Sequence, residues 1–498
     1  MNYIGISAGF HDAALSVIND KGDIVFAGHS ERYSKQKHDK HLSMGIVEDA
    51  LTYCNSKDIE IHYYERPWMK FLRQVRSGEK PALSNLSVKE IIGTGLLHKL
   101  QDGLGGKVYT HNHHLSHAAA GFQTSPYDDA TVVVIDAIGE FDTISIYNAW
   151  YDKNGKAQYK KLWGKKYPDS IGLFYSAMTE RVGLRPLDEE YILMGMSAYG
   201  NDRPLKDMSN ELVESYKDIV FKDNLHTGVS ASFLEGVDDM SIATSAQLIA
   251  EQLITNVISR ARMLGGSKNL VYGGGVALNC LANRLLGEFY DNIWIIPNPG
   301  DAGSSLGASC LGYGKRINWT DAYLGHNIPG DYPVNRLLDH LNTTGIVGVA
   351  SGRAEFGPRA LGHRSLLADP RGKEIKDKVN EIKRRQKFRP FAPVILEEYA
   401  DSYFDMPRGF NNSRYMQVIA RCRHSDLFPA IVHYDGTSRV QTVPKDGSGI
   451  RELLEKWYVL TGCPMLLNTS LNVRGEPMVN DRSDADRFEK LYNITVIS

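Results

Sequence analysis

Short apolar runs alternate with polar turns from the first residues of the chain. Residues 3–7 and 13–18 are apolar runs on either side of a polar loop at residues 8–12. A polar turn at residues 20–23 then leads into a third apolar run at residues 24–27. Runs of this length, bounded by Gly, Asp and Asn, predict a strand, a tight loop, a second strand and a hairpin into a third strand.

The same pattern returns near residue 131. Residues 131–135 form another apolar run, and residues 143–150 continue it as a hairpin. Two strand-rich openings of one kind are consistent with the duplicated halves of an actin-like ATPase core, in which the first hairpin approaches a phosphate. We therefore expect an α/β fold for this part of the chain.

Helical periodicity dominates residues 170–265. Apolar residues within 245–264 recur near the spacing of one helix face. A strand at residues 269–272 follows and runs into Gly273, Gly274 and Gly275, with Asn279 just beyond. Glycines allow close backbone approach and a following helix N-terminus favours an anion, so these residues predict a nucleotide cradle. A tight strand-to-helix turn without a ligand is the alternative.

A second domain is predicted after a change in sequence composition at residues 320–345. The Pro- and Gly-containing stretch 327–333 reads as a connector, and residues 346–350 begin a fresh strand. The chain has 498 residues, which exceeds one ordinary domain. We place the boundary so that residues 1–335 form the first domain and residues 336–498 the second.

Composition excludes some classes of protein. With 42% hydrophobic and 23% charged residues the chain can form full cores, and its net charge of −2 gives no support to a large nucleic-acid surface. The five cysteines are scattered without a Cys-x-x-Cys pair and read as reduced thiols. The opening strand pattern shows no signal peptide, and no apolar run is long enough for a bilayer, so we expect a cytoplasmic protein without a membrane partner.

Two histidines four residues apart predict a metal site. His113 and His117 would project from one face of a helix rich in small residues. Two further ligands are available in Asp136, which ends an apolar strand, and Asp301, in a Gly-rich loop. A site of two imidazoles and two carboxylates suits iron, manganese or zinc, and ligand type does not choose among them. A partly buried polar face is the alternative.

Anion-binding chemistry gathers in the second domain. Arg359 and Arg364 lie in a stretch interleaved with Gly and Pro, where fixed guanidinium groups suit phosphate or carboxylate. A Lys-x-Arg pair follows (Lys387 and Arg389, expected to share one face of a strand), and a Ser-x-Asn pair stands near the C-terminus (Ser470 and Asn472). The positive charge of these side chains suits a triphosphate and a second anion. The alternatives are a solvated loop for the arginine stretch, a solvated charged strand for the Lys-x-Arg pair and a polar turn for the Ser-x-Asn pair.

Motifs along the whole chain resemble those of the O-carbamoyltransferases of the NodU/CmcH type, which carbamoylate hydroxyl groups of sugars and antibiotics. The matching stretches are 9–14, 31–39, 113–122, 135–140, 194–200, 273–283, 300–308, 356–371, 387–393, 433–441 and 468–477. The resemblance implies a duplicated actin-like (ASKHA) N-terminal domain, similar to the tRNA threonylcarbamoyl-transfer subunit. It also implies a C-terminal α/β domain similar to the YrdC-like adenylate synthases.

The resemblance also implies a two-stage reaction. Carbamoyl phosphate and ATP, used with Mg²⁺, would give carbamoyl-adenylate in the C-terminal domain, with Arg439 joining the other cations. The carbamoyl group would then pass to a hydroxyl of a small molecule at the metal site, where His11 matches the catalytic histidine of the family. An imidazole can accept the hydroxyl proton near neutral pH.

Two positions depart from the family pattern and two rival functions stay open. Ala137 replaces the Gly that follows the metal-site Asp, and Ile192 stands where a Lys is usual. Carbamoylation of a nucleotide or nucleic-acid hydroxyl is one rival. A non-catalytic actin-like ATP-binding protein is the other, although intact cation and Ser-x-Asn pairs argue against it. The sequence does not specify the acceptor, the metal or the oligomeric state. A homo-oligomer is therefore one of the states it allows.

Overall fold

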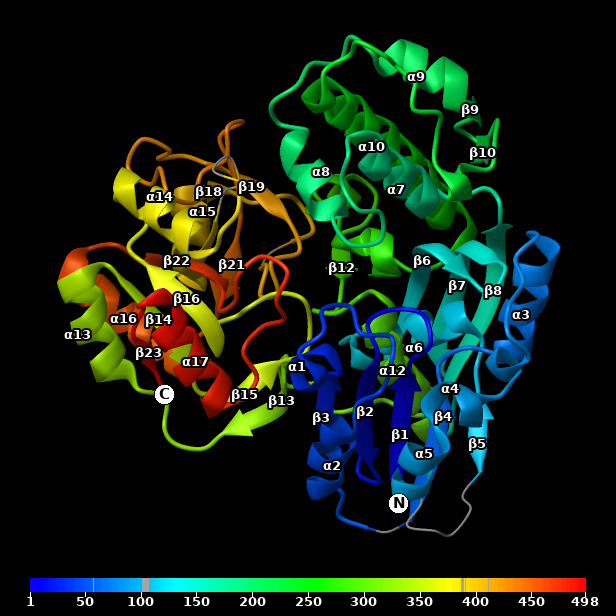
Figure 1. Cartoon of the computed structure of the whole chain (residues 1–498), viewed down its shortest axis with the longest axis horizontal. Coiled ribbons are helices and arrows are strands. Elements are labelled where there is room, and N and C mark those ends of the chain that lie inside the picture. The colour runs from blue at the N-terminus through cyan, green and yellow to red at the C-terminus, as the bar shows by residue number, and fades with distance from the viewer. Residues whose placement is uncertain (57, 101–106, 387–388, 390, 411) are drawn as a thin grey trace.

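Two five-stranded sheets with the same strand order form the N-terminal lobe (Figure 1). The computed structural model describes residues 1–56, 58–100, 107–386, 389, 391–410 and 412–498. The first sheet has the order β3-β2-β1-β4-β5, with strands β1 (Asn2–Ser7), β2 (Ala14–Asn19), β3 (Ile24–His29), β4 (Ile59–Tyr63) and β5 (Val108–Thr110). The second has the order β12-β11-β6-β7-β8, with strands β6 (Asp129–Gly139), β7 (Asp142–Tyr151), β8 (Ala157–Lys166), β11 (Asn269–Gly273) and β12 (Asn292–Trp294).

The strand directions confirm the predicted duplication. In the first sheet β1, β2 and β3 are antiparallel, whereas β4 and β5 run parallel to β1. In the second sheet β6, β7 and β8 are antiparallel, whereas β11 and β12 run parallel to β6. Each half is thus an antiparallel meander extended by two parallel strands, as expected for a duplicated actin-like core.

Two helices pack against each other between the sheets. Helix α6 (His113–Thr124) lies on β6 and β11, and helix α12 (Ser304–Tyr313) lies on β1 and β2. Their backbones meet at Gly307, where an added Cβ atom would lie 1.7 Å from the carbonyl oxygen of Ser116. Only a residue without a side chain allows this approach, and it carries the metal-site histidines toward the start of α12.

Helices cover the remaining faces of the N-terminal lobe. The predicted helix at residues 245–264 is confirmed as part of α10 (Asp239–Leu264), which packs with α7 (Ile171–Arg181), α8 (Glu190–Met196) and α9 (Leu205–Leu212). The segment before residue 105 holds α1 (Glu31–Ser34), α2 (Met44–Thr52), α3 (Pro67–Arg76), α4 (Val88–Ile92) and α5 (Thr94–Leu100). Within the described parts of the chain, no helix combines the length and apolarity needed to cross a membrane.

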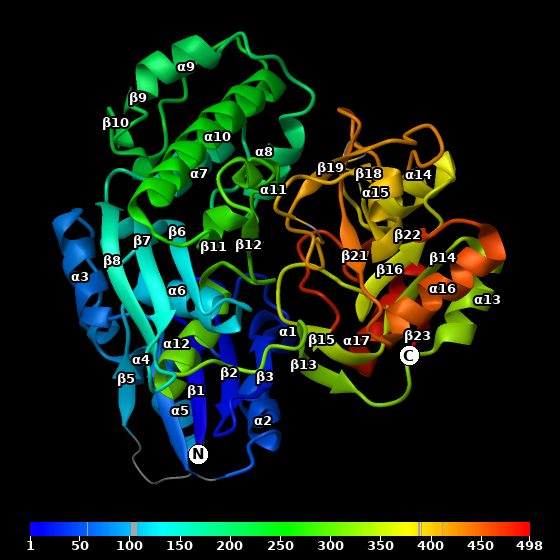
Figure 2. The ribbon, with the colours of Figure 1, turned by 180° about the vertical axis from the view of Figure 1, so that it is seen from behind.

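A six-stranded mixed sheet forms the C-terminal lobe, beside the first N-terminal sheet in both views (Figures 1 and 2). Its order is β21-β17-β22-β16-β14-β23, with strands β14 (Ile346–Ala350), β16 (Arg364–Ala368), β17 (Ala392–Leu396), β21 (Gln441–Val443), β22 (Met465–Ser470) and β23 (Val496–Ile497). Its described α-helices are α13 (Val334–Thr344), α14 (Lys373–Ile382), α15 (Ala400–Tyr403), α16 (Gly449–Thr461) and α17 (Arg482–Tyr492). The α/β class is confirmed, while the boundary after residue 335, which falls inside α13, and the YrdC-like character stay predictions.

Buried arginines connect the two lobes. Strand β13 (Tyr323–Ile328) pairs with β15 (Gly352–Glu355), and Arg32 donates hydrogen bonds to the carbonyl oxygens of Glu355 and Gly357. Arg364 is fully buried, and its five N–H groups all bond to backbone carbonyl oxygens. No donor of Arg364 is left for a ligand, so the expectation that it binds an anion needs correction.

Candidate functional site

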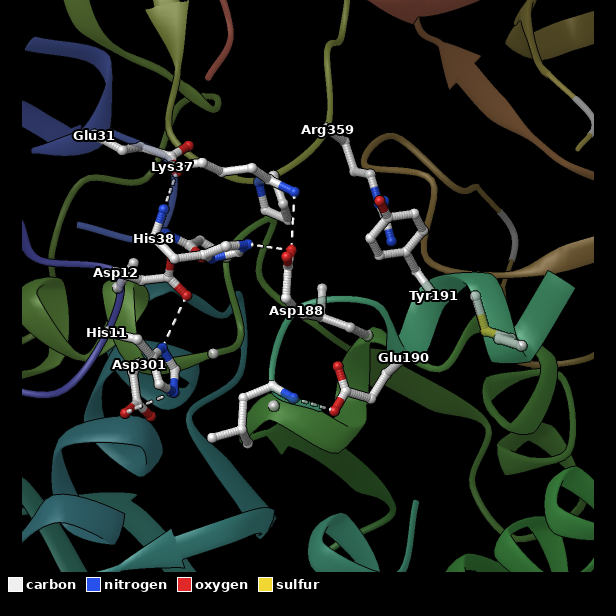
Figure 3. Close-up of a pocket in the computed structure, with 18 of the residues that line it drawn as sticks. His11, Asp12, Glu31, Lys37, His38, Asp188, Glu190, Tyr191, Asp301 and Arg359 are labelled. Carbon is white, nitrogen blue, oxygen red and sulfur yellow. Dashed lines mark hydrogen bonds and ion pairs between the residues drawn. The ribbon is translucent and has the colours of Figure 1, made fainter. Parts of the chain in front are cut away.

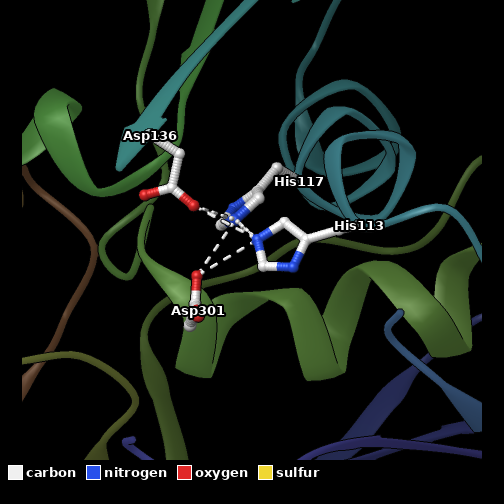
Figure 4. A group of neighbouring side chains, drawn as sticks. All are labelled: His113, His117, Asp136 and Asp301. Carbon is white, nitrogen blue, oxygen red and sulfur yellow. Dashed lines mark hydrogen bonds and ion pairs between the residues drawn. The ribbon is translucent and has the colours of Figure 1, made fainter. Parts of the chain in front are cut away.

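Four side chains from three segments converge at the centre of the N-terminal lobe (Figure 4). His113 and His117 lie one turn apart on α6, Asp136 lies in β6, and Asp301 opens a short helix, η5 (Asp301–Gly303), that leads into α12. The Nε2 atom of His113 lies 3.2 Å from Asp136 Oδ2 and 3.3 Å from Asp301 Oδ1. The corresponding distances from His117 Nε2 are 3.5 and 3.3 Å.

This arrangement fits a divalent metal ion. All four side chains are at least nine-tenths buried, and their ligand atoms lie within 4.8 Å of one another. His117 Nδ1 lies 3.1 Å from the carbonyl oxygen of Pro299, which only accepts, so Nε2 is the nitrogen free to ligate. Burial raises the pKa of Asp136, yet the hydrogen bonds from His113 and His117 hold it well below its usual range. Buried ionised carboxylates require nearby positive charge, which a metal supplies.

The glycine-rich turn passes directly over this cluster. Gly274 has φ +87°, and an added Cβ atom would lie 2.2 Å from the carbonyl oxygen of Ile135. The backbone N–H of Gly275 donates to Asp136 Oδ1 at 3.2 Å. The turn therefore shapes the metal site. Of the predicted cradle, Gly275 and Asn279 line the large cavity described below, whereas Gly273 and Gly274 are buried behind it.

His11 stands beside the metal cluster and is held by a carboxylate. Its Nδ1 lies 2.9 Å from Asp12 Oδ2, and its Nε2 lies 3.9 Å from Asp301 Oδ2. A carboxylate only accepts, so Nδ1 carries the proton and Nε2 is the free base. Sequence reasoning identified His11 but not the partner that orients it.

A chain of charged side chains continues outward from Asp12 (Figure 3). His38 lies between two carboxylates, with Nδ1 2.7 Å from Asp12 Oδ1 and Nε2 2.7 Å from Asp188 Oδ1. Burial lowers the pKa of His38, but hydrogen bonds to Asp12 and Asp188 raise it to about 10. Asp12, His38 and Leu187 all have positive φ angles, and such strained residues cluster at functional sites. The chain fixes the orientation of His11.

One cavity of about 410 Å³ joins the two lobes. At one end it is lined by His11, Asp136 and Asp301. At the other end it is lined by polar and cationic residues of the C-terminal lobe, namely Arg359, Lys383, Arg385, Arg389, Ser470, Asn472 and Arg474. The structure thus places two predicted metal ligands (Asp136 and Asp301) and four predicted residues of the anion site (Arg359, Arg389, Ser470 and Asn472) around a single space.

Lys383 is a site residue that sequence reasoning missed. Its Nζ donates to Ser470 Oγ at 3.0 Å and to Asn472 Oδ1 at 2.7 Å. Lys383 and Arg385 repeat the Lys-x-Arg spacing four residues before the predicted pair, and this was the available signal. The predicted Lys387 lies outside the described residues. Arg389 precedes β17 in irregular chain, so the strand expected to carry it begins later.

Like charges crowd this end of the cavity. Burial and the guanidinium group of Arg439 lower the pKa of Arg359 to about 9. Burial and the neighbouring arginines Arg385 and Arg389 hold the pKa of Lys383 well below its usual range. Among the described residues, Arg359 has no carboxylate within ion-pair distance. Arg474 at this end is paired with Glu189, but the cations around Arg359 outnumber their carboxylate partners, and such a site favours an anionic ligand.

Comparison with known proteins identifies the family. Residues 88–310 and 338–497 match the family models described as "Carbamoyltransferase N-terminus" and "Carbamoyltransferase C-terminus". The chain is 31% identical to uncharacterized protein sll1178 of Synechocystis, over 97% of this chain and 93% of that protein. It is 32% identical to nodulation protein NolO of Bradyrhizobium diazoefficiens, over 75% of each. The 3'-hydroxymethylcephem-O-carbamoyltransferase of Amycolatopsis lactamdurans is 29% identical, over 76% of this chain and 77% of that protein. The chain belongs to the carbamoyltransferase family.

Removing a ligand of the cluster should remove metal. We expect His113→Ala to lower bound metal more than about tenfold, because the remaining three donors no longer surround the ion. Elemental analysis of the dialysed protein measures this. His41→Gln is the control, since His41 is exposed and outside the cluster. Retention of full metal content by a folded His113→Ala protein would show that the ion binds elsewhere.

The raised pKa of His38 should make stability depend on pH. A histidine whose pKa rises from 6.5 to about 10 on folding stabilises the protein fully below pH 6.5. That contribution disappears as the pH rises toward about 10. We expect His38→Gln to destabilise the protein less at the upper end of this window than at the lower end, as measured by urea unfolding. His41→Gln should change stability little throughout, and a pH-independent loss in His38→Gln would refute the assignment.

Proposed function

We propose that the chain makes carbamoyl-adenylate from carbamoyl phosphate and ATP, and then transfers the carbamoyl group to a hydroxyl of a small molecule. The observation that carries this proposal is the single cavity with the metal cluster and His11 at one end and a cationic end opposite. Membership of the carbamoyltransferase family and the printed name of the Amycolatopsis relative support the chemistry.

The cationic end suits the first stage. Lys383, Ser470 and Asn472 form one hydrogen-bonded group, which offers an ammonium and two polar side chains to phosphate oxygens. Arg359 and Arg389 approach the same space and would hold the triphosphate with its Mg²⁺. Water would cleave carbamoyl phosphate to carbamate and phosphate. A carbamate oxygen would then bond to the α-phosphorus of ATP as the α–β phosphoanhydride bond breaks, which gives carbamoyl-adenylate and pyrophosphate.

The other end suits the second stage. His11 Nε2 would take the proton of the acceptor hydroxyl while its Nδ1–H stays bonded to Asp12. The hydroxyl oxygen would bond to the carbamoyl carbon, and the bond from that carbon to the phosphate oxygen would break, releasing AMP. A metal ion held by His113, His117, Asp136 and Asp301 would act as a Lewis acid on the carbamoyl carbonyl.

An assay without acceptor tests the proposed function. Metal-loaded protein given ATP and carbamoyl phosphate should release pyrophosphate and form carbamoyl-adenylate, detected by mass spectrometry. Omission of carbamoyl phosphate is the control. Failure of the active, metal-loaded protein to form any adenylate would rule out the mechanism.

Lys383 should matter strongly for adenylate formation. We expect Lys383→Met to slow pyrophosphate release by about 10- to 100-fold, because a charge-assisted contact of about 1.5–3 kcal/mol is lost. Metal content should stay unchanged, since the Lys383 ammonium contacts Ser470 and Asn472, which are not metal ligands. Lys373→Met removes an exposed lysine outside the cavity and serves as the matched control. An unchanged rate in Lys383→Met would move the anion site elsewhere, and Lys387→Met tests the pair first predicted.

Orientation of His11 by Asp12 gives a further expectation. Asp12→Asn would present a neutral amide to His11 Nδ1 and would lose the tautomer in which Nε2 is the base. Carbamoyl transfer should fall by about 100-fold or more, and by far more than pyrophosphate release without acceptor. Equal losses in both assays would show that Asp12 acts on the whole site and not through His11.

A further inference from the structure

A second cavity, of about 200 Å³, meets the first at the metal cluster. His11, Asp136 and Asp301 line both cavities. The described residues around the second cavity all come from the N-terminal lobe, between Phe10 and Asp301. His11 therefore stands where two spaces join, one with the cationic end and one without it.

The cations of the second cavity are already paired. Lys70 Nζ lies 2.8 Å from Glu65 Oε1, and Arg73 Nη1 lies 2.5 Å from Glu79 Oε1. A third lining glutamate, Glu140, accepts hydrogen bonds from Arg66. The charges of both described lysine and arginine side chains that line this cavity are thus balanced by carboxylates, although Arg73 Nε has no hydrogen-bond partner.

One carboxylate of the second cavity remains without a partner. The side-chain carboxylate of Glu180, at the end of α7, makes no hydrogen bond or ion pair with any residue that the structure describes. Gly228 leaves room for this carboxylate, because an added Cβ atom there would lie 2.5 Å from Glu180 Oε2. The lining as a whole carries more negative than positive side chains, which favours a cationic or neutral ligand over an anion.

An exposed aromatic ring lies close to His11. Phe10 is 47% exposed, and its ring centroid lies 4.7 Å from that of His11. Phe10 and the apolar residues Leu173 and Pro186 line the same cavity as Glu180. Cavities for drug-sized ligands measure about 300–1,000 Å³, so this smaller space suits a ligand part of about one ring.

We propose that the second cavity binds the acceptor, and that the acceptor is a ring-sized hydroxylated amine. Its ammonium group pairs with Glu180, its ring lies by Phe10, and its hydroxyl reaches His11 Nε2. This inference rests on the proposed function, in which the proton of that hydroxyl passes to His11 as the carbamate bond forms and AMP leaves. The acceptor enters through the second cavity while the carbamoyl donor occupies the first.

Three sugars of the same ring size but different charge test the inference. We expect glucosamine to bind the metal-loaded protein about two- to fivefold more tightly than glucose near neutral pH, and glucuronate to bind more weakly than either. The factor is modest because Glu180 is exposed to solvent. Ligand-observed NMR titration measures all three affinities. In Glu180→Gln the preference for glucosamine over glucose should vanish.

Glu235→Gln is the matched control, because it removes an exposed glutamate that lines neither cavity and should keep the preference. The inference is overturned if none of the three sugars binds, if glucuronate binds as tightly as glucosamine, or if Glu180→Gln keeps the wild-type preference. Acceptor-free pyrophosphate release by the wild-type protein is measured in parallel. Its absence refutes the proposed function, whereas the binding preference is scored independently of any turnover.

Discussion

The close approach of α6 and α12 between the two sheets brings together three of the four side chains of the candidate metal site, His113, His117 and Asp301. Gly307 permits this approach because any side chain there would collide with the backbone at Ser116. The contact brings the histidines of α6 against η5, at the start of α12, where Asp301 stands. Strand β6 then supplies Asp136 from the adjoining sheet. Packing of apolar and small residues thus fixes a polar cluster to within hydrogen-bond distances.

The electrostatic balance of the molecule follows from this geometry. Buried carboxylates concentrate negative charge at the metal end of the cavity, whereas Arg359, Arg389 and Lys383 concentrate positive charge at the other end. Burying like charges at either end raises the free energy of the folded protein unless a ligand of opposite charge is bound there. A metal ion and a polyanion would relieve the two ends separately, so the protein can activate a donor and use it within one enclosed space.

Local sequence pattern predicted part of the fold. Apolar runs located the three strands of the first meander, two strands of the second and the long helix α10, because strand and helix periodicities are local properties. Strand β8 was not predicted. The sequence also predicted the four candidate metal ligands, although Asp301 lies far along the chain from His113. Strand ends and Gly-rich loops meet at one edge of an α/β sheet, which brings such residues together. The repeated meander indicated the duplication before any strand order was known.

Contacts between distant segments could not be predicted in the same way. The contact of Lys383 with Asn472 and that of His38 with Asp188 each join segments that no spacing rule relates. Arg364 shows the opposite error, because sequence does not distinguish a guanidinium group that binds an anion from one that binds backbone carbonyls. The second cavity draws on Lys70 and Arg73 of α3, which no motif in the sequence related to His11.

A crystal structure with Mn²⁺ and a non-hydrolysable ATP analogue would test the central claim most directly. That claim is a division of labour between the two ends of one cavity. The account predicts an anomalous Mn²⁺ peak among His113, His117, Asp136 and Asp301, with the triphosphate against Lys383, Ser470 and Asn472. A triphosphate bound only at the Gly275 turn, with the cationic end empty, would contradict it.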